Sequence, residues 1–237
     1  MSFLNKYDVL VSITERDGLI LDRLGNRKPR HTSETGIDLS SLVPTAKNLE
    51  YPSLFHIGAL DWPPSQEGLI WFLNNCWPAI HEKHPELKFY IAGRNVPAWI
   101  ETRFKSEHII FLGEVEDAYH FMNSKAVMVV PLHSGSGIRI KIIEGMALGK
   151  AIVSTSIGCE GIPAIDRENI LIANKPDDFI AAIEALVSDR SLFDRLCKNS
   201  VDFIRERFDN LAIVGSLIEF YQQQLAASGR PGSGVNS

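Results

Sequence analysis

The sequence has no cysteine framework. Only three of its 237 residues are cysteines, and Cys76, Cys159 and Cys197 lie far apart with no CxxC spacing. An odd number of scattered cysteines indicates neither a disulfide scaffold nor a zinc site. We therefore predict that all three are free thiols.

Long hydrophobic runs and an excess of positive charge are absent as well. Apolar runs such as AVMVVPL at 126–132 are far shorter than the roughly 20 residues of a membrane-spanning helix, and the first residues lack the pattern of a secretion signal. The net charge of −5 disfavours a nucleic-acid-binding surface, which needs a basic stripe. We therefore expect a cytoplasmic protein without a nucleic-acid partner.

Three motifs of nucleotide and metal sites are also missing. No GxxxxGK[ST] phosphate loop occurs, and Ile140 stands where a GxGxxG dinucleotide motif would need its third glycine. No DxD sequence occurs either. We therefore expect neither a catalytic metal nor a bound cofactor.

Short β-branched and aromatic runs alternate with helical patterns along most of the chain. The predicted strands are 7–13, 53–60, 87–93, 108–115, 126–132, 151–156 and 169–173. The predicted helices are 15–24, 65–84, 97–106, 117–123, 137–148 and 176–188, followed by two more after residue 189. This alternation predicts an α/β fold with a Rossmann-like parallel sheet, helices on both faces and additional C-terminal helices.

The first 40 residues differ from the rest. They contain one predicted strand and one predicted helix, which cannot close a core alone. We expect residues 1–40 to be the edge of another domain with a linker, residues 41–227 to form the main domain, and residues 228–237 to be a flexible tail. Within the main domain, Trp71, Phe72 and Trp77 have helical spacing and are expected in the core.

The loop after the strand at 126–132 is the richest candidate site. Ligands of open parallel sheets bind outside the carboxyl ends of the strands. Gly135 and Gly137 allow a tight turn there, and Arg139 and Lys141 can neutralise a phosphate. With a helix start near Ile138, the predicted anion cradle consists of the backbone N–H groups of Ser136, Gly137 and Ile138.

Glu144 lies six residues beyond Ile138, about 9 Å along a helix axis. At that distance its carboxylate could accept hydrogen bonds from the ribose hydroxyls of a nucleoside diphosphate. The spacing also allows a plain alternative, because Lys141 and Glu144 are i and i+3 and could be only a surface helix pair. The GSG segment could likewise be only a turn.

Other residues at the carboxyl ends of the predicted strands are weaker candidates. His133 could contact a donor sugar or phosphate, although we favour a solvated loop histidine. Arg94 could border a nucleobase, although a surface charge is the simpler interpretation, and Glu160 could contact the ligand or only hold a turn. Trp62 and Gly58 also lie near the expected crevice, and we include Gly58 among the donor-binding residues.

The ordered motifs of the chain resemble a known family, the retaining group 1 (family four) glycosyltransferases with the GT-B fold. The resemblance runs from about residue 5 to 225 and covers their C-terminal, donor-binding domain. It rests on FHIGALDWPPSQEGLIWFL, FYIAGRNVP, IIFLGEVED, PLHSGSGIRIKIIEGMALGKAIVSTSIGCEGI and FIRERF with FYQQQL. Glu144 matches the second glutamate of the family's E-x7-E motif, which binds ribose, whereas Ser136 replaces the first. The likeness to members with GSGxRxK implies that Arg139 and Lys141 bind the diphosphate and act in catalysis.

The resemblance implies transfer of a sugar from a nucleoside diphosphate sugar, with retention, to a saccharide, lipid-linked or glycoside acceptor in polysaccharide biosynthesis. It also implies that the chain is a fragment, with the acceptor bound mainly by a missing N-terminal domain, and it allows peripheral membrane association of the full enzyme. The alternatives are a non-catalytic nucleotide or sugar-phosphate binding module, a GT-B-type epimerase and a nicotinamide-dependent enzyme.

Overall fold

The computed structural model of the chain describes residues 3–229, which divide into two compact units. The larger unit is Leu39–Arg205, and the described residues on either side of it form the smaller one. The division after Asp38 lies close to the boundary expected at residue 40. Residues 206–227, however, were expected in the main domain and group with the N-terminal segment instead. Most of the expected tail lies outside the described residues.

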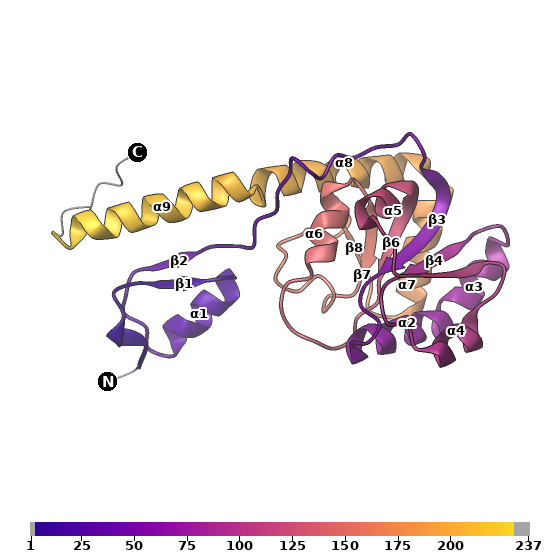
Figure 1. Cartoon of the computed structure of the whole chain (residues 1–237), viewed down its shortest axis with the longest axis horizontal. Helices are drawn as coiled ribbons and strands as arrows, with labels where there is room; N and C mark the ends of the chain where they lie inside the picture. Colours follow the sequence, from indigo (N-terminus) through magenta and orange to yellow (C-terminus); the bar gives the residue numbers. More distant parts are fainter. Residues whose placement is uncertain (1–2, 230–237) are drawn as a thin grey trace. The chain divides into compact units, whose positions relative to one another are not determined.

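The larger unit is built on a six-stranded sheet in which every pairing is parallel (Figure 1). Its strands are β3 Glu50–Ile57, β4 Phe89–Ala92, β5 Ile109–Gly113, β6 Lys125–Val130, β7 Ala151–Ser154 and β8 Leu171–Ile172. They are arranged in the order β5-β4-β3-β6-β7-β8. The predicted α/β class with a Rossmann-like parallel sheet is confirmed.

The alternation of side chains along the strands gives the sheet two apolar faces. Leu54, Val127 and Val153 belong to the main core cluster on one face. The helices that contribute to this cluster are α2 Pro63–Asn75, α3 Trp77–Lys83, α4 Ala98–Phe104, α7 Pro176–Ser188 and α8 Arg190–Arg207.

Phe55 and Met128, one residue further along β3 and β6, point to the opposite face. The ring of Phe55 lies 5.6 Å from that of Phe121 in α5 Ala118–Ser124. Met128 packs against Gly145 of α6 Ile140–Ala147. Helices therefore cover both faces of the sheet, as predicted. Helix α6 packs on the same face as Met128, opposite the main core cluster.

Two predicted helix boundaries are wrong. The helix expected at 65–84 breaks into α2 and α3 at Cys76, because Pro78 follows in the first turn of α3 and cannot continue the preceding hydrogen-bond ladder. The helix expected from residue 137 begins at Ile140. The predicted core positions hold, since Phe72 and Trp77 are buried and Trp71 packs against the core cluster. The three cysteines are free thiols, as expected.

The strand at one edge of the sheet, β8, is only two residues long. Its outward-facing backbone groups are used by the loop that precedes it. The Ile172 N–H donates to Oδ1 of Asp166 at 2.8 Å, and the Ile170 carbonyl accepts from the Arg167 N–H at 2.7 Å. The chain therefore bonds these two backbone groups at the edge of the sheet by itself.

The smaller unit contains η1 Phe3–Lys6, β1 Leu10–Ser12, α1 Glu15–Arg23, β2 Arg30–Thr32 and α9 Asn210–Ala227. β1 and β2 pair in parallel, so the N-terminal segment holds two strands rather than the single predicted one. Residues 206–227 join this unit through specific contacts. The His31 and Phe220 rings stack 5.1 Å apart, and Ile37 forms a backbone bridge with Asp209.

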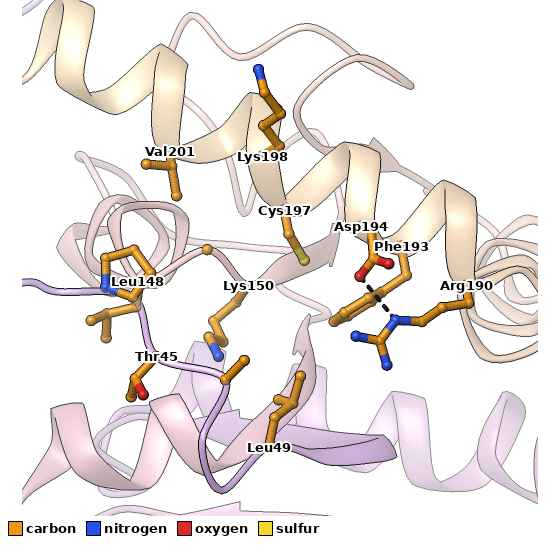
Figure 2. Close-up of a pocket in the computed structure, with 13 residues that line it drawn as sticks. Thr45, Leu49, Leu148, Lys150, Arg190, Phe193, Asp194, Cys197, Lys198 and Val201 are labelled. Atoms are coloured by element: carbon orange, nitrogen blue, oxygen red, sulfur yellow. Dashed lines mark hydrogen bonds and ion pairs between the residues drawn. The ribbon is translucent and has the colours of Figure 1, made fainter.

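A pocket of about 310 Å³ lies in the larger unit at the amino end of β7 (Figure 2). Lys150, which lines it, is only 2% exposed. Its ammonium donates to the carbonyls of Asn123 at 3.3 Å and Lys125 at 3.2 Å, and it forms no ion pair among the described residues. Burial lowers the pKa of the Lys150 amine to about 8.

The low pKa of Lys150 contributes a pH dependence to the stability of the fold in the alkaline range. The folded chain releases this proton near pH 8, whereas the unfolded chain holds it to about pH 10.5, so the contribution of Lys150 to the free energy of unfolding rises with pH between these values. Above pH 9 the thiols of Cys76 and Cys197, whose pKa burial raises to about 12, contribute in the opposite direction. We expect about 2 to 3 kcal/mol from this group. In urea unfolding across this window, the free energy of unfolding of the wild type should therefore increase with pH relative to that of Lys150→Met. Lys198→Met, at an exposed lysine lining the same pocket, is the control and should retain this increase; equal slopes in all three proteins would contradict the assignment.

Candidate functional site

The crevice between the carboxyl ends of β3 and β6 is the switch point of the sheet. From β3 the chain continues to β4 on one side, and from β6 it continues to β7 on the other. In open parallel sheets the connecting helices diverge at this position and leave room for a ligand. A cavity of about 300 Å³ lies here, lined by the end of β3, the end of β6, Trp62, Ser65 and residues 138–142.

The loop after β6 turns the chain toward this cavity with two glycines. Gly135 and Gly137 have φ angles of 108° and 88°, in the left-handed region that favours glycine. Because of these turns the helical conformation starts only after Arg139, which is the N-cap of α6. The predicted N–H cradle is therefore displaced, since Ser136, Gly137 and Ile138 precede the helix. The outward N–H groups of the first turn are those of Ile140 and Lys141.

Arg139 folds back onto its own loop. One guanidinium nitrogen, Nη1, donates to the carbonyls of Ser136, at 2.8 Å, and Gly137. The guanidinium carbon lies 5.3 Å from the centre of a Trp62 ring. The other two nitrogens, Nε and Nη2, are buried without a hydrogen-bond partner. Burial lowers the pKa of Arg139, and the nearby charge of Glu160 opposes this shift.

Lys141, Glu144 and Tyr119 form a cluster one turn further along α6. The Lys141 ammonium lies 2.7 Å from Oε2 of Glu144, and the Tyr119 hydroxyl donates to Oε1 at 3.0 Å. The spacing of Lys141 and Glu144 thus places them on one helix face, as predicted. Glu144 is only 8% exposed, whereas 42% of the Lys141 side chain is exposed, so the pair is half-buried. Lys141 lines the cavity but Glu144 does not, and the cluster extends the site toward α5.

The remaining predicted residues are divided between the cavity and the surface. Gly58 lines the cavity, and Glu160 is close enough to Arg139 to influence its charge. His133 is exposed, with its ring 4.3 Å from that of Trp71. Arg94 is exposed too and does not line the cavity; its backbone carbonyl accepts from the Leu60 N–H at 3.1 Å.

Three polar residues of the site escaped sequence reasoning: His56, Ser65 and Tyr119. Tyr119 reaches Glu144 from α5 across 25 positions of sequence, a contact that no local spacing indicates. His56 and Ser65 lie within apolar strand and helix patterns. In such patterns the sequence alone does not distinguish a residue that lines a cavity from one in the core. Among residues 3–229 no group of three His, Cys, Asp or Glu side chains is placed to hold a metal.

The sequence and the fold both have known relatives. A profile described as "Glycosyl transferases group 1" matches residues 51–189. Phosphatidyl-myo-inositol mannosyltransferase of Mycobacterium leprae is 25% identical over 204 residues, which cover 82% of this chain and 53% of that protein. The chain spans about half the length of the curated relatives that it matches over most of its own length.

Two solved structures show the same fold at low sequence identity. Anabaena HepE in complex with UDP-glucose superposes with a TM-score of 0.72 at 15% identity, covering 91% of this chain and 64% of that one. The C-terminal domain of a Francisella tularensis group 1 glycosyl transferase, LpcC, superposes with a TM-score of 0.62 at 16% identity. That match covers 74% of this chain and all of the C-terminal domain.

Proposed function

The chain belongs to the group 1 glycosyl transferases, and we propose that it forms the part of such an enzyme that binds a nucleoside diphosphate sugar. The observation that carries this proposal is the pair of buried, unpartnered guanidinium nitrogens of Arg139 at the mouth of the switch-point cavity. Buried donors without acceptors are costly, and an anionic oxygen would satisfy them. Lys141 adds a second cation to the same cavity.

The neighbouring groups fit the rest of a nucleotide. The N–H groups of the first turn of α6 and its helix dipole favour a phosphate between Arg139 and Lys141. Glu144 lies four residues into α6 from Ile140, about 6 Å along the axis, where its carboxylate would accept from the ribose hydroxyls. Its present partners, Lys141 and Tyr119, orient the carboxylate through an ion pair and a hydrogen bond.

The proposed reaction is transfer of the sugar, with retention, to a saccharide, lipid-linked or glycoside acceptor. Arg139, Lys141 and the start of α6 would stabilise the charge that develops on the departing diphosphate, which requires no metal from the protein. A cytoplasmic location is part of the same proposal. Within residues 3–229 no helix is long and apolar enough to cross a membrane.

Titration calorimetry with UDP, GDP, ADP and NAD tests the donor class. We expect one of the nucleoside diphosphates to bind more tightly than NAD, and binding of NAD alone would overturn the proposal. Turnover by the whole protein then separates the alternatives: transfer of the sugar to an acceptor identifies a transferase, an epimerised nucleotide sugar an epimerase, and binding without turnover a binding module.

Glu144→Gln tests the ribose assignment. The substitution keeps the shape of the side chain but replaces a charged acceptor by an amide, so we expect a loss of about 1.5 kcal/mol in nucleoside diphosphate affinity, roughly tenfold. Calorimetry with the ribose form and its 2′,3′-dideoxy analogue measures it. The analogue lacks the hydroxyls and should bind the wild type and the variant equally. An equal loss for both ligands would mean that Glu144 shapes the site instead of contacting ribose.

A further inference from the structure

Apart from Arg139 and Lys141, most of the wall of the switch-point cavity is apolar. Ile57 and Met128 line it from the sheet, and Ile138 and Ile142 line it from the loop and α6. A hexose that entered such a cavity would bury several hydroxyl groups, and a buried hydroxyl without a partner costs free energy. The cavity therefore favours a ligand group that is mostly apolar and carries few polar atoms.

Two buried polar side chains, His56 and Ser65, interrupt this apolar wall. The Nδ1 atom of His56 lies 2.9 Å from the Val129 carbonyl oxygen, which can only accept, so Nδ1 carries the proton. The Nε2 atom then carries no proton and accepts from the Ser65 hydroxyl over 3.4 Å, which is a long hydrogen bond. Burial lowers the pKa of His56, which keeps the imidazole neutral at neutral pH. The Ser65 hydroxyl could exchange its long bond to Nε2 for a shorter one by rotating toward a ligand acceptor.

Gly58 leaves the space beside this pair open. A Cβ atom built on Gly58 would lie 3.7 Å from Nε2 of His56 and 3.6 Å from Oγ of Ser65, both in van der Waals contact. Because glycine has no side chain, position 58 does not cover these two polar atoms on the cavity wall. The cavity thus offers one acceptor and one donor side by side, surrounded by apolar side chains.

We infer that this cavity takes the acetamido group of a donor whose sugar is a 2-acetamido-2-deoxyhexose, an inference that rests on the proposed function. The amide N–H donates to Nε2 of His56, and the amide carbonyl accepts from the Ser65 hydroxyl. The methyl group packs against Met128, Ile138 and Ile142. A secondary amide supplies one donor, one acceptor and a methyl group, which is the complement of this wall, whereas a 2-hydroxyl leaves the apolar part unfilled.

Calorimetry with UDP, UDP-glucose and UDP-N-acetylglucosamine tests the inference. With about 1 kcal/mol for each of two hydrogen bonds, we expect the wild type to bind UDP-N-acetylglucosamine at least about tenfold more tightly than UDP-glucose. His56→Leu and Ser65→Ala should each lower this preference by about fivefold, which corresponds to one hydrogen bond of about 1 kcal/mol. His84→Leu, at the C-terminal end of α3, is the matched control and should leave it unchanged.

The affinity for UDP itself shows whether each variant is folded. It also distinguishes failure of the acetamido assignment from failure of the proposed donor binding. If the wild type binds UDP but prefers UDP-glucose, or binds GDP-mannose more tightly than UDP-N-acetylglucosamine, the acetamido assignment fails and donor binding stands. If the wild type binds no nucleoside diphosphate, both proposals fail. If His56→Leu weakens UDP as much as UDP-N-acetylglucosamine, His56 only supports the phosphate loop, and the inference is overturned.

Discussion

The double variant Arg139→Ala, Lys141→Ala is expected to lose nucleoside diphosphate binding by more than about 100-fold. Each cation would make a charge-assisted contact with phosphate, worth about 1.5 to 3 kcal/mol, so each single variant should lose roughly 10- to 150-fold. The affinity for the corresponding nucleoside, which has no phosphate, should change little. Calorimetry with the diphosphate and the nucleoside measures both quantities.

Arg94→Ala is the matched control for this experiment. Arg94 follows β4 at the same end of the sheet, but it is exposed and does not line the cavity. We expect its diphosphate affinity to equal that of the wild type. Since the proposed contacts are ionic, the affinity of the wild type should also fall with added salt more steeply than that of the double variant. Equal losses for nucleoside and diphosphate would show that Arg139 and Lys141 support the loop and do not bind phosphate.

Gly93→Ala is expected to destabilise the fold by about 3 kcal/mol or more. The carboxyl ends of β3 and β4 approach so closely that an added Cβ would lie 1.7 Å from the carbonyl oxygen of Gly58. A backbone atom cannot move aside as a flexible side chain can, so the strands themselves must shift. Because Gly58 lines the cavity, the surviving folded protein should also bind nucleotide more weakly.

Gly113→Ala separates the clash from backbone strain. Gly113 has a positive φ of 66°, but a Cβ there would meet no atom within 4 Å. Its substitution should cost only about 1 to 2 kcal/mol from the left-handed conformation. Urea unfolding of both variants gives the comparison. A cost for Gly93→Ala no greater than that for Gly113→Ala would mean that the two strands separate easily.

The sequence predicted the layered fold because strand and helix periodicities are local properties. The apolar runs in β3, β6 and β7 differ from the helical patterns between them, and their alternation leaves few arrangements besides a covered parallel sheet. Boundaries were less predictable. The start of α6 depends on how Gly135 and Gly137 turn the chain, and glycine permits this turn without specifying where it ends.

The site was predictable only as far as its contacts are local. Lys141 and Glu144 are one helical turn apart, so their pairing follows from spacing alone. The Tyr119 contact with Glu144 depends instead on how α5 packs beside α6. The position of His56 in the cavity depends likewise on the order of the strands in the sheet, which places β3 beside β6.

The short β8 strand has a consequence for how copies of the protein behave in concentrated solution. A sheet edge with unused N–H and C=O groups is a template on which a strand of another molecule can add. At the edge formed by β8, the Ile172 N–H and the Ile170 carbonyl are already bonded to Asp166 and Arg167 of the same chain. These bonds leave fewer free groups for growth of the sheet from one molecule into the next on this side, and so disfavour aggregation by strand addition there.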